Sequence, residues 1–494
     1  MKKTKALILS LLLLVCFGGA QAKDYNASLF GIKSNGTTMN TTAIQKAIDY
    51  IHEQGGGRLV FYVGRYLTGS INLRSNVTIQ LNEGAVLLGS TNPYDYPIDS
   101  SYCALVRAVK VDNVAITGKG VIDGQGREAS YNLLDQIQKG IINDPAKYDR
   151  PDGSRRARTL YFRECKDVTI DGITLKNSGD WVQTYDQCDR LKINGITVDS
   201  KAYWNNDGLD IVDCRNTTVT NSFIDATDDG ICLKSHSHEH MCENIEIRNC
   251  VARSSASGIK FGTVSAGGYK NIRIINNKVY DTFRSAFTIA TPDGGVVENI
   301  LVDSLYAYNV GNAIFLRIGN RWTKGSVGSI DGVTIRNMYC ELSDGKPDAG
   351  YEYEGPVEDL PRNISPASIV GLKGYDIRNV KLENVTIVTP GGGNPYYAKV
   401  GTSAKELDAI PEMADRYPEF SQFKELPAWG FYIRHAKDIA FDNVKFIAKN
   451  RDYRPAIVTD DVKGLSLADV TFEEPGAKKK QIHTYQTTNI QINK

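Results

Sequence analysis

Four aspartates lie in two short clusters near the middle of the chain. Asp207 and Asp210 belong to the segment Asn-Asn-Asp-Gly-Leu-Asp, and Asp228 and Asp229 belong to Thr-Asp-Asp-Gly. Hydrolysis of a glycosidic bond needs a carboxylic acid that protonates the leaving oxygen and a carboxylate that activates water. A single Asp-Asp-Gly usually marks a turn. Here Asp228 follows Asp207 by 21 residues, close to one repeat of the surrounding strand pattern, which favours a catalytic role.

Short apolar strand cores repeat along the chain. From Ile170 the steps are 23, 26, 26, 27 and 28 residues, and they lead to Ile193, Val219, Ile245, Ile272 and Ile300. The pattern returns at Val333, Val380, Ile439 and Leu465, and residues 77–81 and 114–118 resemble the first coils. A period in the twenties, with Asn or Gly after most cores, is typical of a β-solenoid. If each repeat is one coil, the two acidic clusters lie side by side on one face.

The repeats predict an all-β fold, a single-stranded right-handed parallel β-helix of about ten coils over residues 58–475. Because an uncovered coil is an exposed sheet edge, we expect an N-terminal helical cap at residues 41–52, N-capped by Asn40 or Thr41. The apolar positions with helical spacing are Ile44, Ala47, Ile48 and Ile51. Long stretches without the repeat are predicted to be lids or groove walls. They are residues 124–158, 343–366 and 389–428.

The first 22 residues have the features of a secretory signal peptide. Lysines precede an apolar stretch at residues 6–17, and Ala20-Gln21-Ala22 provides a small-residue cleavage site. Val15 stands where a lipobox before Cys16 needs a small residue, which argues against lipid anchoring. The apolar stretch is shorter than the ~20 residues that span a bilayer. We therefore expect a secreted or periplasmic protein without membrane insertion, whose residues 23–494 form one catalytic domain and which is a monomer.

Composition argues against several other functions. The net charge is +1, with no concentrated basic region, so nucleic-acid binding is not expected. Cysteines such as Cys165 with Cys188 could form disulfides in an oxidising compartment, but small core residues between coils are the favoured interpretation. The alternating histidines at 236, 238 and 240 lack partner ligands, so a polar loop is favoured over a metal site. We expect no metal and no other cofactor.

The acidic clusters resemble two motifs of glycoside hydrolase family 28, the polygalacturonases and rhamnogalacturonan hydrolases. This family carries Asn-Thr-Asp, Asp-Asp, Gly-His-Gly and Arg-Ile-Lys in that order. Asn205-Asn206-Asp207 matches the first motif with Asn in place of Thr, and Asp228-Asp229 matches the second. Ser257 stands at the position of the family His, and Thr288-Ile289-Ala290 stands where Arg-Ile-Lys is expected. The groups that contact the substrate carboxylate in the family are therefore absent.

The resemblance implies an inverting reaction with defined roles for three aspartates. Asp228 would be the general acid, and Asp207 and Asp229 would together hold and deprotonate the attacking water. Carboxylates this close repel one another, so one of them is expected to keep its proton at neutral pH. For Asp210 we expect a corner-stabilising role.

Polar and cationic residues near this face could bind the carboxylate of a uronic acid. The candidates are Lys234, Ser257, Lys260, Arg284 and Arg317. Most other Lys and Arg residues are expected to be solvated surface charges. We favour relocation of the carboxylate contact to Lys260, Arg284 or Arg317, with Lys260 first because it stands where the family has a small residue. Aromatic residues before the acidic cluster could stack on sugar rings or pack in the coil. They are Trp181, Tyr185, Tyr203 and Trp204.

We expect a secreted inverting glycoside hydrolase that cleaves pectic poly- or oligosaccharides with a galacturonide or related uronide. One alternative is a polysaccharide lyase on the same fold, with Lys260 or Arg284 as the base and the three aspartates as calcium ligands. The other is a non-catalytic carbohydrate-binding solenoid, against which the concentration of repelling carboxylates argues. The inserts at 124–158 and 389–428 could close one end of the groove, which would favour exo cleavage.

Overall fold

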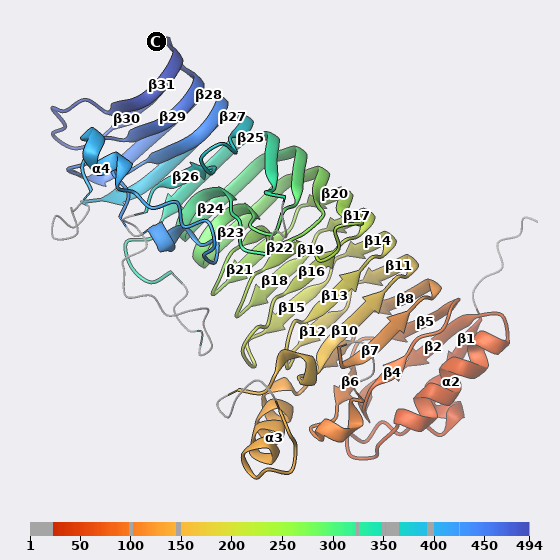
Figure 1. Ribbon diagram of the computed structural model, residues 1–494. Coiled ribbons are helices and arrows are strands. Elements are labelled where there is room, and N and C mark those ends of the chain that lie inside the picture. Colours follow the sequence, from red (N-terminus) through yellow and green to blue (C-terminus); the bar gives the residue numbers. More distant parts are fainter. Residues whose placement is uncertain are drawn as a thin grey trace, which may run out of the picture.

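The computed structural model describes residues 23–97, 102–144, 150–322, 326–347, 351, 365–392, 400–423 and 425–493. The signal peptide expected at residues 1–22 lies outside the described residues. Strands predominate, and the α-helices of the described chain are α2 (Thr41–Glu53), α3 (Gly126–Gln138) and α4 (Ala404–Asp408). The strands form one elongated stack of coils from β1 to β31 (Figure 1). None of the helices in these ranges is long and apolar enough to cross a membrane.

The coils contribute strands to three sheets, which we call faces A, B and C in chain order. Face A contains β1 (Asp24–Asn26), β2 (Gly57–Phe61), β5 (Val77–Leu81), β8 (Asp112–Gly118), β11 (Lys166–Asp171), β14 (Asp189–Asn194), β17 (Arg215–Thr220) and β20 (Cys242–Arg248). Face B contains β3 (Gly64–Thr68), β6 (Ala85–Gly89), β9 (Val121–Asp123), β12 (Thr174–Lys176), β15 (Thr197–Ser200), β18 (Phe223–Ala226) and β21 (Val251–Ser254). Face C contains β4 (Ile71–Asn72), β7 (Ala104–Val109), β10 (Arg158–Arg163), β13 (Gln183–Asp186), β16 (Leu209–Val212), β19 (Ile231–Ser235) and β22 (Ile259–Ser265).

Most later strands are longer and pass from one face to the next, the exceptions being the short β26 and β30. β23 pairs with β20, β21 and β22 and so runs through all three faces. The remaining strands are β23 (Gly268–Thr291), β24 (Val296–Ile318), β25 (Ser329–Leu342), β26 (Ala367–Val370), β27 (Ile377–Gly391), β28 (Phe431–Asn450), β29 (Ile457–Ala468), β30 (Thr471–Glu473) and β31 (Ile482–Asn493). Strands of neighbouring coils pair in parallel, as β16 does with β19 and β19 with β22. The all-β parallel β-helix expected from the repeats is confirmed.

The observed register follows the repeat spacing of the sequence with one exception. Ile170 pairs with Ile193, and Ile193 pairs with Val219, as the steps predict. Val219, however, pairs with Ile247, whereas Ile245 lies opposite Thr217. Both isoleucines of β20 are buried, because alternate residues of a strand point to the same side. The apolar pattern alone therefore could not distinguish the two registers.

Asparagine ladders hold the corners of successive coils. Asn244, Asn271 and Asn299 all have positive φ, near 55°, a conformation that Asn tolerates better than most residues. The Asn271 side-chain amide donates to Asn244 Oδ1 at 3.1 Å, and the Asn299 amide donates to Asn271 Oδ1 at 2.8 Å. The same residue type thus supplies both the turn and a hydrogen bond between coils.

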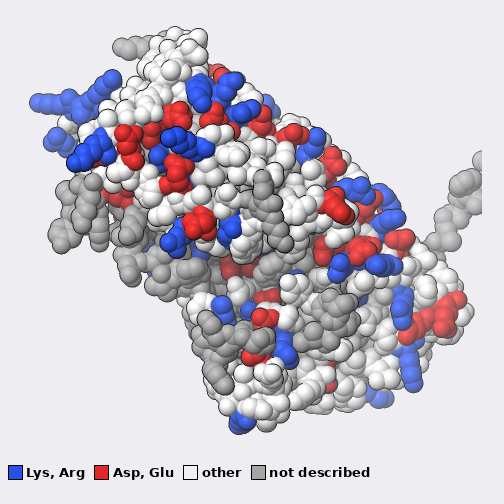
Figure 2. All heavy atoms as spheres, in the orientation of Figure 1, with Lys and Arg blue, Asp and Glu red and all other residues white. Residues whose placement is uncertain are grey.

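The interior is one apolar cluster that runs from Tyr25 to Leu467. The eight cysteines of the described chain are all buried with free thiols, which confirms the core placement favoured from the sequence. Helix α2 packs against β2, β4 and β5 and buries the four apolar positions expected of it. The Asn40 side chain does not cap this helix and instead accepts a hydrogen bond from the Lys33 N–H at 2.8 Å. Acidic and basic side chains are interspersed on the face shown in Figure 2.

The asparagine ladder leads to a stability prediction for Asn271. Asn271→Ala removes both ladder hydrogen bonds and places a residue with a Cβ but no polar group in the left-handed region. Asn271→Gly removes the same bonds but relieves the backbone strain. We expect the Ala variant to be less stable than the Gly variant by about 1 kcal/mol, measured from urea unfolding. An Ala variant as stable as the Gly variant would contradict this explanation of the corner.

Candidate active site

The two acidic clusters lie at the start of face C on neighbouring coils. Asp207 and Asp229 each stand two residues before a strand, β16 or β19. The Gly208 N–H donates to the Asp229 carbonyl oxygen at 2.9 Å, and Leu209 pairs with Ile231. Asp207 is therefore stacked beside Asp229, and side-chain oxygens of the two lie within 4.8 Å of each other. The predicted adjacency of the clusters is confirmed.

The turn before Asp207 is fixed by two asparagines. Asn206 is fully buried, and its amide donates to the carbonyl oxygens of Ser178 at 3.0 Å and Asp180 at 3.1 Å. Asn205 has a φ of 58°, so the chain reverses sharply just before the acid. Asn206, which replaces the family Thr, thus ties this turn to the preceding coil.

Lys234 bonds to two of the aspartates. Its ammonium lies 2.6 Å from Asp207 Oδ2 and also bonds Asp210 Oδ1. Asp210 lies within β16 rather than at a corner, and burial raises its pKa to about 6 against the opposing effect of Lys234. Burial likewise raises the pKa of Asp207. One buried ammonium therefore serves two carboxylates and is not free to bind a substrate.

Lys260 bonds to the third aspartate. Its ammonium donates to Asp229 Oδ2 at 2.7 Å and to the Tyr417 hydroxyl at 3.2 Å, and the side chain is 2% exposed. The Ser257 N–H donates to Asp229 Oδ1 at 3.1 Å. Burial alone would raise the pKa of Asp229, but Lys260, Lys234 and Arg284 outweigh it and hold that pKa below its usual value. Asp229 is therefore ionised at neutral pH.

Asp228 differs from its neighbours because no cation bonds it. Its oxygens accept hydrogen bonds from the Asp229 N–H at 2.9 Å and from the Asn205 amide at 3.4 Å. No Lys or Arg of the described chain lies within ion-pair distance of it. Burial, followed by the charge of Asp229, raises the pKa of Asp228. It is also the most accessible of the three candidate catalytic aspartates, being half-buried.

The other two candidate cations are bonded elsewhere. Arg284 is 2% exposed and pairs with Glu419 at 3.0 Å. Arg317 is also 2% exposed, and its guanidinium donates to the carbonyl oxygens of Gly371 at 3.2 Å and of Glu412. The Thr288 and Ala290 positions, where the family has cations, provide no charge. The structure thus brings Lys234, Ser257 and Lys260 to the aspartates and turns Arg317 towards backbone carbonyls.

Residues 400–423 pack over later coils of face C, and Tyr417 and Glu419 of this segment reach Lys260 and Arg284 beside the aspartates. Tyr417 contacts Lys260, and its ring centre lies 5.8 Å from the Arg284 guanidinium and 5.9 Å from that of Arg321. The sequence identified this insert, at 389–428, as a lid or wall but did not single out Tyr417 or Glu419. Nothing local marks either residue, because their importance comes from contacts with Lys260 and Arg284, which lie more than 100 positions away in the chain.

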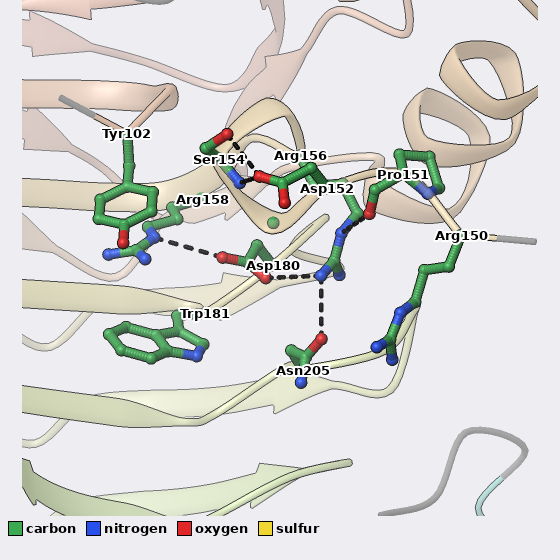
Figure 3. Close-up of a pocket in the computed structure, with 11 residues that line it drawn as sticks. Tyr102, Arg150, Pro151, Asp152, Ser154, Arg156, Arg158, Asp180, Trp181 and Asn205 are labelled. Atoms are coloured by element: carbon green, nitrogen blue, oxygen red, sulfur yellow. Dashed lines mark hydrogen bonds and ion pairs between the residues drawn. The ribbon is translucent and has the colours of Figure 1, made fainter. Parts of the chain in front are cut away.

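A pocket of about 460 Å³ lies beside the aspartates on the N-terminal side. Figure 3 shows its lining, in which Asp180 lies between Arg156 and Arg158. Trp181, singled out from the sequence, lines this pocket, whereas Tyr185 is a core residue. Asn205 belongs to the lining and also bonds Asp228, so the pocket adjoins the candidate acid. The arginines and Asp180 were not recognised from the sequence, since they match no motif.

Side chains of Asp207, Asp229 and Cys232 have the proximity of a metal-ligand group. However, the two carboxylates already bond the ammoniums of Lys234 and Lys260. Burial also raises the pKa of the Cys232 thiol well above its usual value, so this sulfur is a poor anionic ligand. The arrangement fits a network of ion pairs better than a cation cage.

Comparison with known proteins gives the family. The model of the glycosyl hydrolases family 28 matches residues 61–346. This match covers more than half of the chain, so the chain belongs to that family. The resemblance seen in the acidic motifs is thereby confirmed.

Individual relatives are identical to this chain at about a quarter of the aligned positions. An exo-poly-alpha-D-galacturonosidase of Dickeya chrysanthemi is 26% identical over 309 residues, which cover 53% of this chain and 51% of that enzyme. The chain thus spans about half the length of this relative. A probable polygalacturonase of Vitis vinifera is 27% identical over 362 residues, covering 66% of this chain and 70% of the relative.

Two solved structures share the fold. The family 28 exopolygalacturonase of Yersinia enterocolitica has a TM-score of 0.63 and 20% identity, covering 95% of this chain and 78% of that one. The exopolygalacturonase of Thermotoga maritima has a TM-score of 0.59 and 22% identity, covering 74% of this chain and 87% of that one.

The Lys260 contact leads to a prediction on pH dependence. In Lys260→Gln the side chain can still donate to Asp229 but no longer carries a charge, so the pKa of Asp229 should rise. If Asp229 must be ionised for activity, the acidic limb of the kcat/KM profile moves to higher pH by about one to three pH units. The measurement is kcat/KM against pH on a pectic oligosaccharide.

Lys270→Gln is the matched control, because Lys270 pairs with Glu298 on the exposed side of face A. Its profile should be that of the unaltered enzyme. A higher KM for the Lys260 variant with an unmoved acidic limb would instead assign Lys260 to substrate binding, as first expected from the sequence.

Proposed function

We propose that this member of glycosyl hydrolase family 28 hydrolyses galacturonide or related uronide linkages in pectic saccharides with inversion at the anomeric carbon. The observation that carries the proposal is the unequal distribution of cations over the three aspartates. Asp207 and Asp229 each bond a buried ammonium, whereas Asp228 bonds none. An ammonium favours the ionised carboxylate, and burial without one favours the acid. The cluster therefore contains both protonation states that the reaction needs.

The reaction follows from these states. Asp228 donates its proton to the glycosidic oxygen as the bond to the anomeric carbon breaks. A water held by Asp207 and Asp229 attacks the opposite side of that carbon and gives its proton to this pair. Oxygens within 4.8 Å of each other can both accept hydrogen bonds from one water. Proton exchange with solvent then removes the proton from Asp207 and Asp229 and restores Asp228 to its acid form.

The names of the relatives support the substrate class. The Dickeya relative is an exo-poly-alpha-D-galacturonosidase and the Vitis relative a probable polygalacturonase. We extend galacturonide specificity from them to this chain as a proposal, because the family cations that contact a carboxylate are replaced here.

A lyase is the less favoured second candidate. Elimination would need Lys260 or Arg284 to accept a proton as a neutral base. Burial opposes the charged form of both, but Asp229 beside Lys260 and Glu419 beside Arg284 outweigh it and raise both pKa values. Both side chains therefore stay protonated. Ion pairing of Asp207 and Asp229 with lysines also disfavours the calcium that a lyase often uses.

The remaining proposals concern the whole protein. We propose that residues 1–22 direct export to the periplasm or the medium and that residues 23–494 act as one monomeric catalytic domain. Parallel strands joined by a crossover are right-handed in almost all proteins, so we also propose a right-handed coil. The burial of the apolar face of α2 against β2 and β4 supports its role as the N-terminal cap.

The role of Asp228 can be tested by Asp228→Asn, which keeps the shape of the side chain but removes the transferable proton. We expect kcat on pectic oligogalacturonides to fall by about 10²–10⁴-fold, the usual contribution of general acid catalysis. Asp167→Asn, on the exposed side of face A, serves as the control and should keep normal activity. NMR of the first product should show inverted anomeric configuration. Near-normal turnover by the Asp228 variant, or retention of configuration, would contradict the mechanism.

A further inference from the structure

We propose that the pocket formed by Arg150, Arg158, Tyr102 and Trp181 binds the carboxylate of a uronate unit beside the scissile bond. This proposal rests on the function proposed above and names the residues that would select its anionic substrate. The starting point is that Lys234, Lys260, Arg284 and Arg317 are all bonded within the protein. A uronate carboxylate therefore needs a different cation.

Arg158 is a buried cation that shares its carboxylate partner, Asp180, with Arg156. Its side chain is 2% exposed, and its Nη1 donates to Thr184 Oγ1 at 2.9 Å. Its Nε makes an ion pair with Asp180 Oδ2 at 3.5 Å that lacks the alignment of a hydrogen bond. The single carboxylate of Asp180 thus serves both Arg156 and Arg158, so this pair of arginines keeps one positive charge that a ligand anion can balance.

Two aromatic rings hold the Arg158 guanidinium in place. Its central carbon lies 3.8 Å from the centre of the Tyr102 ring and 4.3 Å from that of the Trp181 ring. Lys234 lies 3.9 Å from the same Trp181 ring, so Trp181 links the pocket to the lysine that bonds Asp207. Both rings are partly exposed, and exposed aromatic surface suits the C–H face of a sugar.

Arg150 and Arg156 complete the pocket in different ways. Arg156 is saturated, because it pairs with Asp180 at 3.0 Å and donates to the Gly179 and Trp204 carbonyl oxygens. Arg156 therefore holds the pocket wall in place and has no donor left for a ligand. Arg150 is exposed and makes no ion pair with a described residue; its guanidinium lies 5.4 Å from the centre of the Trp204 ring. Figure 3 shows it approaching from the side opposite Tyr102.

The charges of the lining favour an anion. Arg150, Arg156 and Arg158 face Asp152 and Asp180, which leaves one positive charge unbalanced. A planar guanidinium can bind both oxygens of a carboxylate, whereas a hydroxyl offers no charge. The pocket volume of about 460 Å³ lies within the ~300–1,000 Å³ usual for ligand sites. The volume, the charge and the guanidinium geometry of the pocket thus all suit the binding of one uronate unit.

Binding without turnover tests the pocket directly. In an Asp228→Asn background, calorimetric titration with digalacturonate should give a Kd that rises about ten- to a hundredfold in Arg158→Gln and in Arg150→Gln, the loss of one charge-assisted contact. Digalactose with the same linkage, which lacks the carboxylates, should not respond to either change. Arg150 is exposed, so its variant remains informative if Arg158→Gln folds poorly.

Arg190→Gln is the matched control, since Arg190 is an exposed arginine on face A that pairs with Asp167. It should bind digalacturonate normally. Normal digalacturonate affinity in both pocket variants overturns the pocket proposal, even where Asp228 proves essential for hydrolysis. If uronate binding depends on these arginines but the protein cleaves no uronide, the pocket proposal is supported and the proposed hydrolysis is contradicted.

Discussion

The structure of the site depends on the close parallel stacking of coils. Neighbouring strands lie about 4.8 Å apart, so carboxylates at the same register position cannot avoid one another. Asp207 and Asp229 are in that position, with side-chain oxygens within 4.8 Å. Two buried like charges at this distance are costly unless cations accompany them. Lys260 supplies such a cation for Asp229 and holds its pKa low, and Lys234 opposes the rise in pKa that burial causes in Asp207 and Asp210.

This constraint explains how the chain differs from the family pattern. Lys260 stands where the family has a small residue, next to Ser257 at the family His position. Once Lys260 pairs with Asp229, its ammonium is part of the acid-base group rather than of the substrate site. Arg284 is likewise held by Glu419 from the segment that covers face C. The cations that we expected from the sequence to bind the substrate, Lys260 and Arg284, are instead paired with Asp229 and with Glu419 of the insert.

Much of the fold could be predicted from the sequence because each coil repeats the same local chemistry. The alternation of apolar residues predicted the strands, and the recurrence of Asn at the corners predicted the length of the repeat. The predicted register differed from the observed one only at β20, where Ile245 and Ile247 are both apolar and buried. The adjacency of the aspartates followed from the period alone. The partners of Lys260, Arg284 and Arg317 could not be predicted, because Tyr417, Glu419 and Glu412 reach them from an insert without a repeat.

The cations on the two sides of the aspartates differ in how fully the protein itself pairs them. Towards the C-terminus, the insert at 400–423 already neutralises or hydrogen-bonds the cations of face C. Towards the N-terminus, Arg156 and Arg158 of the pocket share the carboxylate of Asp180, and the exposed Arg150 makes no ion pair with a described residue. Asn205 joins this pocket to Asp228, since its side-chain oxygen accepts from Arg156 at 2.9 Å and its amide donates to the acid. A uronate that enters the pocket therefore also affects the electrostatic surroundings of the candidate acid, because it adds a negative charge beside Asn205 that favours the protonated form of Asp228.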